Sequence, residues 1–488
     1  MRIPKGRGQW FIGGAFILSF FTFLALRMDL FSQAPPPAIA PSLTALADRE
    51  SWRIITRGGE RIGHAHRRLT RGAAGYHLEE EVFMRLNQLG VVQDVETGLQ
   101  AAFGEDGSVS SFTYRLASGV FQYRLQGQIE QGQLVLLGGA PGDLRKTILP
   151  LGGKPYLASG LVEALDLLPW QEGESRQFQL LDPSIPAIKP ARVRYLGRER
   201  INLAGRNYPS KKYSLSLAGA EQFAWISEEG EVLKETGLLG ITIEKATREE
   251  VRRDFPASPG LDLAEAAAIR ADKTIEEPTD LSRLTLRLLN LPSGELSLEG
   301  GRQTFRDGLL TITKEALPPG SAKTAPLPGP EKYLAATARI QSDHPRIKET
   351  LAKISSPGDQ PLTKAKKILE WVYKNIEKRP VISIPNALDT LANRVGDCNE
   401  HAVLLAALAR AAGIPTGVEA GLVYQGGRFY YHAWNVFYLD GWVTADATFG
   451  QLPADVTHIR LVRDEGAGLV ALLGVIGKLG IEIVEMAK

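Results

Sequence analysis

The sequence predicts an α+β protein in which an N-terminal apolar helix precedes a largely antiparallel β region and a C-terminal region of helices followed by strands. Three observations predict this fold class. Residues 10–26 form an uncharged apolar run, residues 49–250 alternate apolar and polar positions between turn residues, and the apolar spacing becomes helical after residue 330. With 488 residues, the chain is too long for one ordinary core, so more than one domain is expected.

The composition is that of an ordinary globular protein. Charged residues make up 23% and hydrophobic residues 44% of the chain, which excludes a wholly disordered polymer. The formal net charge is +2, and no basic stripe with interleaved aromatic residues occurs in the sequence. We therefore expect no nucleic-acid partner.

The N-terminal apolar run predicts a membrane anchor. As a helix, residues 10–26 would be roughly 25 Å long, which is the short end of a membrane span. Basic residues precede the run and only Arg27 follows it closely, a bias that keeps the N-terminus in the cytoplasm. The prediction is a single-pass membrane protein with residues 1–9 in the cytoplasm, residues 10–28 as a transmembrane signal-anchor, and the main body periplasmic or extracellular.

A cleaved signal peptide is the alternative, because Ser32-Gln33-Ala34 offers a small-x-small cleavage site. Under either interpretation the body is exported. Residues 29–48 then form a Pro/Ala-rich spacer that would hold the body away from the membrane. Exported proteins often carry disulfides, yet this chain has one cysteine, so it can form no intramolecular disulfide. The single thiol is therefore buried, paired with another molecule, or reactive.

Four stretches follow the spacer. Residues 49–250 predict a β-rich extracytoplasmic domain built on an antiparallel sheet, curved or sandwich-like. Residues 251–330 are a Pro-containing connecting region with a few strands, and the pattern leaves open whether they form a small domain or a linker. Residues 331–460 combine helical and strand periods in one α+β domain. Residues 461–488 are a C-terminal extension with a short apolar helix and a strand.

Cys398 is the candidate nucleophile. It follows the Gly396-Asp397 turn and begins an apolar helix, where unpaired N–H groups and the helix dipole favour a thiolate and offer an oxyanion hole. A base has to reach this thiol, and a third group has to orient the base. His432 and Asp446 lie on two consecutive predicted strands and supply both groups. The sequence therefore predicts a triad of Cys398, His432 and Asp446.

The turn between those two strands decides whether the triad can form. A two-residue hairpin loop at Asp440-Gly441 would place His432 and Asp446 on opposite faces of the sheet. A three-residue loop with Gly441 in the left-handed region pairs residue 438 with residue 442 instead. Asp446 then lies diagonal to His432 on the same face, within reach of its ring. The triad therefore predicts the longer loop.

Four motifs surround the triad in a fixed order. They are a Gly-x-Cys at a helix start, an Arg-Ala-x-Gly-Ile-Pro helix exit, a His-Ala-Trp strand and a Gly-Trp…Asp-x-Thr strand, within GDCNEHAVLLAALARAAGIPTGVEAGLVY…YYHAWNVFYLDGWVTADATFGQ. This run resembles the bacterial transglutaminase-like superfamily. The resemblance implies a papain-like core and a transglutaminase-like catalytic domain at residues 331–460, with Cys398 as nucleophile, His432 as base and Asp446 as orienting acid. It also implies that no metal or organic cofactor is required.

Two positions depart from the pattern of that superfamily. Asn435 follows the His-Ala-Trp motif where relatives often continue differently, and Ala447 replaces the usual Pro of Asp-Pro-Thr. Neither change removes a catalytic group, so the departures concern the strands rather than the triad.

Other aromatic and histidine residues near the motifs have plainer explanations. We expect Trp434 and Trp442 to pack as walls of the substrate cleft. His401, one turn after the cysteine, is expected to be a satisfied helix-face histidine and not a second base. His64 and His66 share one strand face, but no third ligand is evident nearby, so a solvated strand face is expected there and not a metal site.

These features predict an exported, membrane-tethered cysteine enzyme that acts on amide bonds through a thioester. Water as acceptor would make it a peptidase or amidase, and an amine would make it a protein-glutamine acyltransferase; the residues leave both open. The expected substrate is a peptide or protein of the bacterial cell envelope, and the β region is expected to have an envelope protein as a partner. The alternative is a non-catalytic envelope binding or assembly module, its cleft filled by the C-terminal tail or by residues 315–330.

Overall fold

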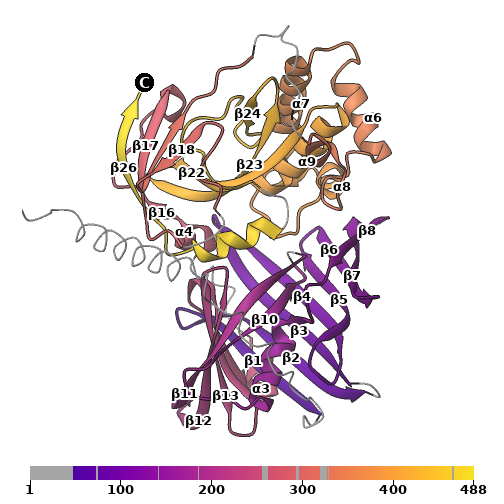
Figure 1. The fold of residues 1–488 in the computed structure, drawn as a ribbon, viewed down its shortest axis with the longest axis vertical. Helices are drawn as coiled ribbons and strands as arrows, with labels where there is room; N and C mark the ends of the chain where they lie inside the picture. The colour runs from indigo at the N-terminus through magenta and orange to yellow at the C-terminus, as the bar shows by residue number, and fades with distance from the viewer. Residues whose placement is uncertain are drawn as a thin grey trace, which may run out of the picture.

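The structure, a computed structural model, describes residues 48–488 except 73–74, 141, 185, 255–261, 293–295, 319–326, 328 and 464–466. The predicted cytoplasmic segment, signal-anchor and nearly all of the spacer lie outside these residues. Within the described ranges, no helix is long and apolar enough to cross a membrane. Figure 1 shows an N-terminal part in indigo and magenta and a C-terminal part in orange and yellow.

The N-terminal part is built on one fifteen-stranded sheet. Strands β1 to β8 form an antiparallel meander, β10 to β15 form a second one, and β9 pairs parallel with β10. Because β1 pairs with both β2 and β15, the two meanders join along β1. The strands are β1 (Arg49–Arg57), β2 (Glu60–Gly72), β3 (Gly75–Gln88), β4 (Val91–Phe103), β5 (Val109–Ser118), β6 (Phe121–Glu130), β7 (Gln133–Ala140), β8 (Asp143–Pro150), β9 (Pro155–Leu157), β10 (Ser175–Asp182), β11 (Ala187–Leu203), β12 (Arg206–Leu217), β13 (Ala220–Ser227), β14 (Val232–Thr236) and β15 (Ile241–Ala246).

A short helix lies between the two meanders. It is α2 (Ala158–Ala164), followed by a short 3-10 turn, η2 (Leu165–Leu167). Ala164 packs into a core with residues of β2 to β7, whereas Leu161 packs into a second core with residues of β10 to β14. The alternating pattern of the strands thus supplies two apolar faces, and α2 fills the space between them.

The C-terminal part packs helices against a sheet. The apolar stripe predicted from residue 362 onward forms the buried face of α7 (Pro361–Asn375), which begins with Pro at its first turn. The helix that begins at Cys398, α9 (Cys398–Ala411), is buried on almost every side and lies at the centre of this core. The other helices are α5 (Glu331–Leu334), α6 (Pro345–Ile354) and α8 (Ala387–Asn393).

The sheet beside α9 has the strand order β16-β23-β22-β25, and β24 pairs with β23. Asn435, the departure from the family pattern, is buried in β23 and donates its Nδ2 to the carbonyl oxygen of Ala402 at 3.0 Å, which ties the sheet to α9. The strands are β16 (Ile269–Arg270), β22 (Thr416–Gln425), β23 (Arg428–Tyr438), β24 (Trp442–Ala445) and β25 (Ile459–Arg463). The predicted boundary at residue 460 falls inside β25.

The connecting region and the C-terminal extension form a common sheet. Its order is β18-β19-β17-β26, so β26 pairs with β17, a strand some 200 residues earlier. These strands are β17 (Arg283–Leu289), β18 (Gln303–Arg306), β19 (Leu309–Thr313) and β26 (Gly480–Ala487). The extension also contains η5 (Ala467–Gly474), which Figure 1 shows in yellow between the two parts of the molecule. The smaller elements are η3 (Leu238–Gly240), α3 (Arg248–Arg252), α4 (Leu263–Ala267) and η4 (Pro278–Asp280).

The N-terminal sheet contacts the segment that leads into α9. Gln93 of β4 donates its side-chain amide to the carbonyl oxygen of Pro380 and accepts from the Ile382 N–H, both at 3.1 Å. Phe121 of β6 packs with Val381 and Val395 in a small core. Two-residue strands, β20 (Glu377–Lys378) and β21 (Val395–Gly396), pair in parallel just before Cys398. The β region therefore borders the segment that precedes the candidate nucleophile.

Candidate active site

The start of α9 is held by a capping box. Asp397 is the N-cap, its carboxylate accepts from the backbone N–H groups of Asn399 and Glu400, and the Glu400 carboxylate accepts from the Asp397 N–H at 2.9 Å. Ser383 donates a hydrogen bond to the buried Glu400 carboxylate, which connects the helix start to the preceding segment. This arrangement fixes the backbone on which the partly exposed Cys398 is mounted.

The cap changes the expected oxyanion hole. The sequence predicts several unpaired N–H groups at this helix start, but the Asp397 side chain occupies those of Asn399 and Glu400, and the His401 N–H bonds to the Asp397 carbonyl oxygen at 3.1 Å. Within the described part of the chain, the Cys398 N–H has no hydrogen-bond partner. Among the first backbone N–H groups of α9, the Cys398 N–H is therefore the one that remains available to another acceptor.

The turn between β23 and β24 has the register that the triad requires. Tyr438 pairs with Trp442 and Asn435 with Ala445, so the predicted pairing of residues 438 and 442 is confirmed. The predicted conformation of Gly441 is wrong: Asp440 occupies the left-handed region with φ 67°, and Gly441 has φ 155°. Asp440, and not Gly441, is the left-handed residue of the loop. The loop length is as predicted, and so His432 and Asp446 lie on the same face of the sheet.

His432 and Asp446 meet as the register requires. The His432 Nε2 lies 2.7 Å from the Asp446 Oδ2, and Asp446 is completely buried. The other carboxylate oxygen, Oδ1, accepts from the N–H groups of Thr448 at 2.6 Å and Phe449 at 3.2 Å. The Phe449 ring stacks on the His432 ring, with centroids 5.1 Å apart and planes 15° apart. Since Nε2 is used by the carboxylate, Nδ1 is the ring atom that remains for a substrate or a thiol.

The thiol lies beside the strand that carries His432. The β23–β24 ladder runs only from residue 435 to residue 438, so β23 has no β24 partner at Ala433. The backbone of Ala433 hydrogen-bonds Cys398 there, and both residues belong to the same apolar core. The structure therefore brings Cys398 next to the backbone of the residue that follows His432.

The electrostatic surroundings of Cys398 differ from the sequence-based expectation. Burial raises the pKa of the Cys398 thiol well above its usual value, the charges of Asp397 and Glu400 raise it further, and the hydrogen bond from Ala433 lowers it. Burial, followed by the Asp397 charge, also raises the pKa of Glu400. The helix start alone was expected to favour a thiolate, but its capping carboxylates act in the opposite direction. The surroundings of Cys398 in the structure therefore favour the neutral thiol over the thiolate.

A second histidine, which sequence reasoning missed, contacts the same carboxylate. The His458 Nε2 lies 2.9 Å from the Asp446 Oδ2, and its Nδ1 lies 3.2 Å from the Asp455 carbonyl oxygen and 3.3 Å from the Asp455 Oδ1. Burial opposes ionisation of Asp446, but the charge and hydrogen bond of His432, together with His458, hold the pKa of Asp446 well below its usual range. Burial likewise opposes charge on His458, but hydrogen bonds to Asp446 and Asp455 outweigh it and raise the pKa of His458 to about 9.

These three side chains also fit the donor types of a metal site. One donor atom each of His432, Asp446 and His458 lies within 4.8 Å of the others. The Nε2 atoms of His432 and His458 both lie at hydrogen-bond distance from the Asp446 Oδ2. With the two backbone N–H groups on Oδ1, the Asp446 carboxylate accepts from four donors. We therefore interpret the group as a hydrogen-bonded network around an ionised carboxylate.

The two tryptophans expected to line the cleft differ in position. Trp434 is buried, its ring lies 6.1 Å from the His432 ring at 22°, and its Nε1 donates to Glu419 at 2.9 Å. Trp442 lies at the turn end of the strand pair, where its ring packs against those of Tyr333 and Tyr438. Trp434 is therefore a neighbour of the triad, whereas Trp442 packs away from it.

The remaining histidines do not extend the site. His401 is buried, not on an open helix face; its Nδ1 lies 2.7 Å from the Asp397 carbonyl oxygen, and its Nε2 has no partner among the described residues. His66 lies 2.7 Å from a Glu50 oxygen and stacks on Trp52 at 3.9 Å, while His64 stacks on Phe83 at 5.4 Å. Both histidines are partly buried under these contacts, and the His64 Nδ1 is buried, so the predicted solvated strand face is only partly exposed to solvent.

A glycine opposite His432 allows β25 to approach. Gly421 of β22 pairs with His432 on one side and with Arg460 on the other, and a Cβ added to it would lie 1.9 Å from the Ile459 carbonyl oxygen. We expect Gly421→Ala to force β25 away and to destabilise the C-terminal part by roughly 1–3 kcal/mol or more. Hydrogen exchange of the β22 and β25 amides measures the effect. Gly358→Ala, where a Cβ meets nothing within 4 Å, is the matched control; equal exchange in the two variants would contradict the expectation.

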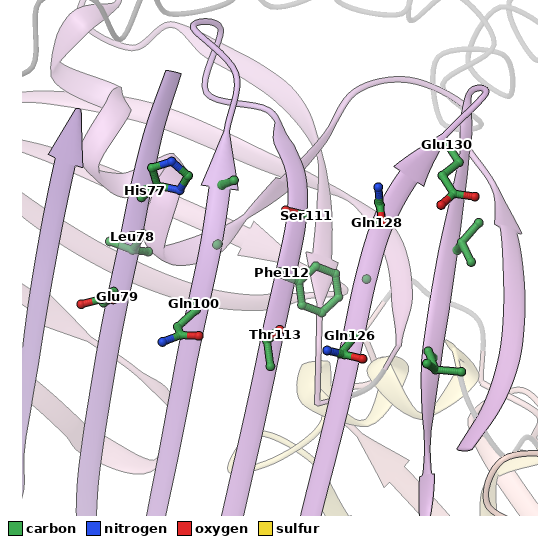
Figure 2. Close-up of a pocket in the computed structure, with 15 residues that line it drawn as sticks. His77, Leu78, Glu79, Gln100, Ser111, Phe112, Thr113, Gln126, Gln128 and Glu130 are labelled. Atoms are coloured by element: carbon green, nitrogen blue, oxygen red, sulfur yellow. The ribbon is translucent and has the colours of Figure 1, made fainter. Parts of the chain in front are cut away.

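Two hollows lie on the N-terminal sheet, and Cys398 does not line either of them. One of about 630 Å³ lies over β3 to β7, and Figure 2 shows polar side chains such as Gln100, Thr113, Gln126 and Gln128 along its strands. A neighbouring one of about 880 Å³ includes Trp52 and the two stacked histidines. Neither contains a thiol or a triad, so the chemistry is assigned to the C-terminal part.

One comparison with known proteins agrees with this assignment. Residues 348–447 match the family model of the transglutaminase-like superfamily. A search of curated proteins found no match. Three solved structures are similar to parts of the chain. They are a candidate cysteine protease from Cytophaga hutchinsonii (17% identity, 42% of this chain and 84% of that chain, TM-score 0.27), a β-barrel-like protein from Brucella abortus (11%, 41% and 95%, 0.31) and the periplasmic domain of TgpA from Pseudomonas aeruginosa (16%, 53% and 89%, 0.22).

Proposed function

Because residues 348–447 are a domain of the transglutaminase-like superfamily, we propose that the protein is a cysteine-dependent amide hydrolase or acyltransferase. Cys398 is its nucleophile, His432 its base and Asp446 the acid that orients the base. The observation that carries the proposal is the buried hydrogen bond of 2.7 Å between His432 and Asp446, next to the strand position where Ala433 contacts the thiol. This arrangement is the nucleophile–base–orienter set of covalent acyl transfer.

The proposed reaction begins from a neutral thiol and a neutral imidazole. The His432 Nδ1 takes the proton of Cys398 as the sulfur attacks the carbonyl carbon, and the Cys398 N–H donates to the developing oxyanion. His432 then gives its proton to the leaving amine, and the C–N bond breaks to leave a thioester. Water or a second amine, deprotonated by His432, attacks the thioester and releases the thiol.

The location and partners of this enzyme belong to the same proposal. The apolar run at residues 10–26 and the basic residues before it support a membrane tether with the body outside the cytoplasm. A peptide or protein of the cell envelope is the proposed substrate, and the N-terminal sheet is proposed to contact an envelope protein. A fusion of alkaline phosphatase after residue 488 tests the topology, because that enzyme is active only outside the cytoplasm of a bacterial host.

A non-catalytic scaffold would need a filled cleft, and the contacts of the C-terminal tail oppose filling by the tail. β26 pairs with β17, and Gly474 of η5 lies against the turn at Ala218–Gly219, so the C-terminal tail packs elsewhere. Glu315 accepts from Thr444 of β24 at 3.0 Å, and Cys398 remains partly exposed. These contacts support the enzyme over the scaffold.

The thiol's response to pH tests the proposal directly. Since the thiol rests neutral, we expect the iodoacetamide alkylation of Cys398 in the wild type to depend on base catalysis by His432 and to proceed at pH values below the ordinary cysteine pKa of about 8.5. In His432→Ala it should titrate above that value, because burial and the Asp397 and Glu400 charges then act without a base. Mass spectrometry of the alkylated protein measures the rates, and the chain's single cysteine makes the signal unambiguous.

The same protein provides a control variant for the alkylation profile and a test of whether water or an amine accepts the acyl group. His344→Ala, on the helix α6 side of the domain, should leave the profile unchanged. Release of nitrophenol from p-nitrophenyl acetate should require Cys398, and adding a primary amine would show whether water or the amine resolves the thioester. A thiol that titrates alike in the wild type and His432→Ala would overturn the assignment of the base.

A further inference from the structure

The carboxylate of the proposed triad is shared by two histidines. His432 and His458 both point Nε2 at the Asp446 Oδ2, at 2.7 and 2.9 Å. The two ring centroids lie 5.7 Å apart, and His458 is completely buried. A three-residue triad needs only one of these rings, so the second one requires an explanation of its own.

The hydrogen-bond partners of His458 determine which of its two ring nitrogens carry a hydrogen. Its Nδ1 faces two oxygens of Asp455, the carbonyl at 3.2 Å and a carboxylate oxygen at 3.3 Å, and neither of these can donate a hydrogen. Its Nε2 faces the Asp446 Oδ2, an oxygen of a carboxylate that is kept ionised by two backbone N–H donors on Oδ1. Hydrogens are therefore required on both ring nitrogens, and the ring is an imidazolium.

The charged groups around His458 balance this cation. Asp446 and Asp455 face it directly, and Asp455 is itself fixed by the Thr457 N–H at 2.8 Å and the Gln451 side-chain amide at 3.0 Å. Arg302 donates to the His458 carbonyl oxygen and is paired with Glu315 at 3.1 Å, so its charge is compensated. The rings of Trp434 and Phe449 close the remaining sides, at 5.2 and 6.0 Å from the His458 ring.

We propose that His458 is a positioning residue of the proposed enzyme: a second histidine, charged at neutral pH, that fixes the Asp446 carboxylate and limits its influence on His432. This inference rests on the proposed function. Because both rings share one carboxylate oxygen, His458 compensates part of the Asp446 charge that faces His432 and holds the carboxylate that orients its ring. A neutral base next to a neutral thiol is the state from which proton transfer during attack can begin.

Two substitutions separate the two tasks of His458. Glutamine can keep a donor at the Nε2 position against Asp446 but carries no charge, so His458→Gln should preserve orientation and remove the cation. Alanine removes both, so His458→Ala should also lose the fixed carboxylate. His77→Gln, at an exposed position of β3, is the matched control. Circular dichroism and thermal unfolding establish that each full-length variant is folded.

The expected results are shifts in the alkylation profile of Cys398. His458→Gln should move the limb governed by His432 to higher pH by about one unit, with a maximal rate within about threefold of the wild type. His458→Ala should lower the maximal rate by about tenfold or more, since Asp446 loses a charged donor. Profiles of both variants that coincide with His77→Gln would overturn the proposal, even if His432→Ala had already confirmed an activated thiol.

The charge of His458 is measured independently of thiol reactivity. In protein labelled with ¹⁵N-histidine, both His458 ring nitrogens should have the shifts of protonated nitrogen at pH 8, and the His458→Gln spectrum identifies the signals. A neutral ring at pH 8 overturns the proposal whatever the thiol does. If His432→Ala leaves alkylation unchanged, the proposed function fails, and the positioning role fails with it even where the spectrum shows an imidazolium.

Discussion

Replacing Asp446 with asparagine is expected to lower turnover of p-nitrophenyl acetate by roughly 10³- to 10⁴-fold, the loss seen when the orienting carboxylate of other triads is replaced. The carboxylate accepts from four donors, two histidine rings and two backbone N–H groups. An amide has one acceptor oxygen and would turn its NH₂ group toward donors. His432 would then lose its orientation, and His458 would lose one of its two anionic partners.

The same substitution should also destabilise the C-terminal part, by about 3–5 kcal/mol, because it leaves a buried cation with one partner fewer. The sign of the pH dependence follows from the pKa of Asp446, which its histidine partners hold well below the usual range despite burial. A depressed carboxyl pKa contributes stability that is present above the unfolded value of about 4 and is lost as the pH falls through the folded value. The difference in the free energy of unfolding between wild type and Asp446→Asn should therefore be largest at pH 7 and should shrink below about pH 4.

Hydrogen exchange of β23 and of residues 446–458 at pH 7 measures the stability effect, and nitrophenol release measures the catalytic one. Asp359→Asn is the matched control, since Asp359 pairs with Lys367 at the surface and such pairs contribute little. An Asp446→Asn variant that kept wild-type turnover would remove Asp446 from the proposed triad.

The sequence predicted the parts of the site that depend on neighbouring segments. Cys398 follows a turn at a helix start, and His432 and Asp446 lie on strands joined by one short loop, so alternation and loop length placed them on one face. His458 could not be found in this way. The chain after Asp446 turns back at once, with Asp446 and Gln451 exchanging two backbone hydrogen bonds of 2.9 Å, and it returns through Asp455 before His458 faces Asp446. The path of such an irregular loop cannot be predicted from a periodic sequence pattern.

The electrostatic error has a similar origin. A helix N-terminus favours anions in general, and the sequence contained nothing that placed the capping side chains relative to the sulfur. In the structure Asp397 and Glu400 form a capping box that uses the N–H groups and adds negative charge beside Cys398. Local motifs therefore identified the nucleophile, whereas its protonation depended on the side chains around it.

In the N-terminal sheet, too, local sequence patterns predicted the elements but not the contacts between distant residues. Alternating positions indicated its strands, but the pairing of β1 with β15 joins residues that are about 190 apart in sequence, such as Trp52 and Ala246. That contact folds the two meanders around α2 and buries arginines that an alternating pattern would assign to a solvated face. Arg53 and Arg67 are 3% and 5% exposed, and both contact Glu163 of α2.

This buried charge network predicts a second large effect. Glu163 accepts from Arg53 at 3.1 Å and from Arg67 at 2.9 Å, and the two arginines pair further with Glu235 and Glu80. Burial opposes the charge of Glu163, but the charges and hydrogen bonds of Arg67 and Arg53 lower its pKa. We expect Glu163→Gln to cost about 3–5 kcal/mol at pH 7, because it leaves two buried guanidinium groups around a neutral amide.

The loss should be confined to the N-terminal part, since the network lies within β1, β2, β3, β14 and α2. Hydrogen exchange should rise in those elements while the alkylation rate of Cys398 stays at the wild-type value, because α9 has its own core. Glu81→Gln, at an exposed position of β3, is the control of equal chemistry. The stability that Glu163 contributes is present above its unfolded pKa of about 4.3 and is lost in acid. The hydrogen-exchange rates of Glu163→Gln and Glu81→Gln should therefore converge as the pH falls below that value. An unchanged exchange pattern in Glu163→Gln at pH 7 would mean that the arginines are sufficiently neutralised by Glu80 and Glu235, and that α2 is held between the meanders by apolar packing alone.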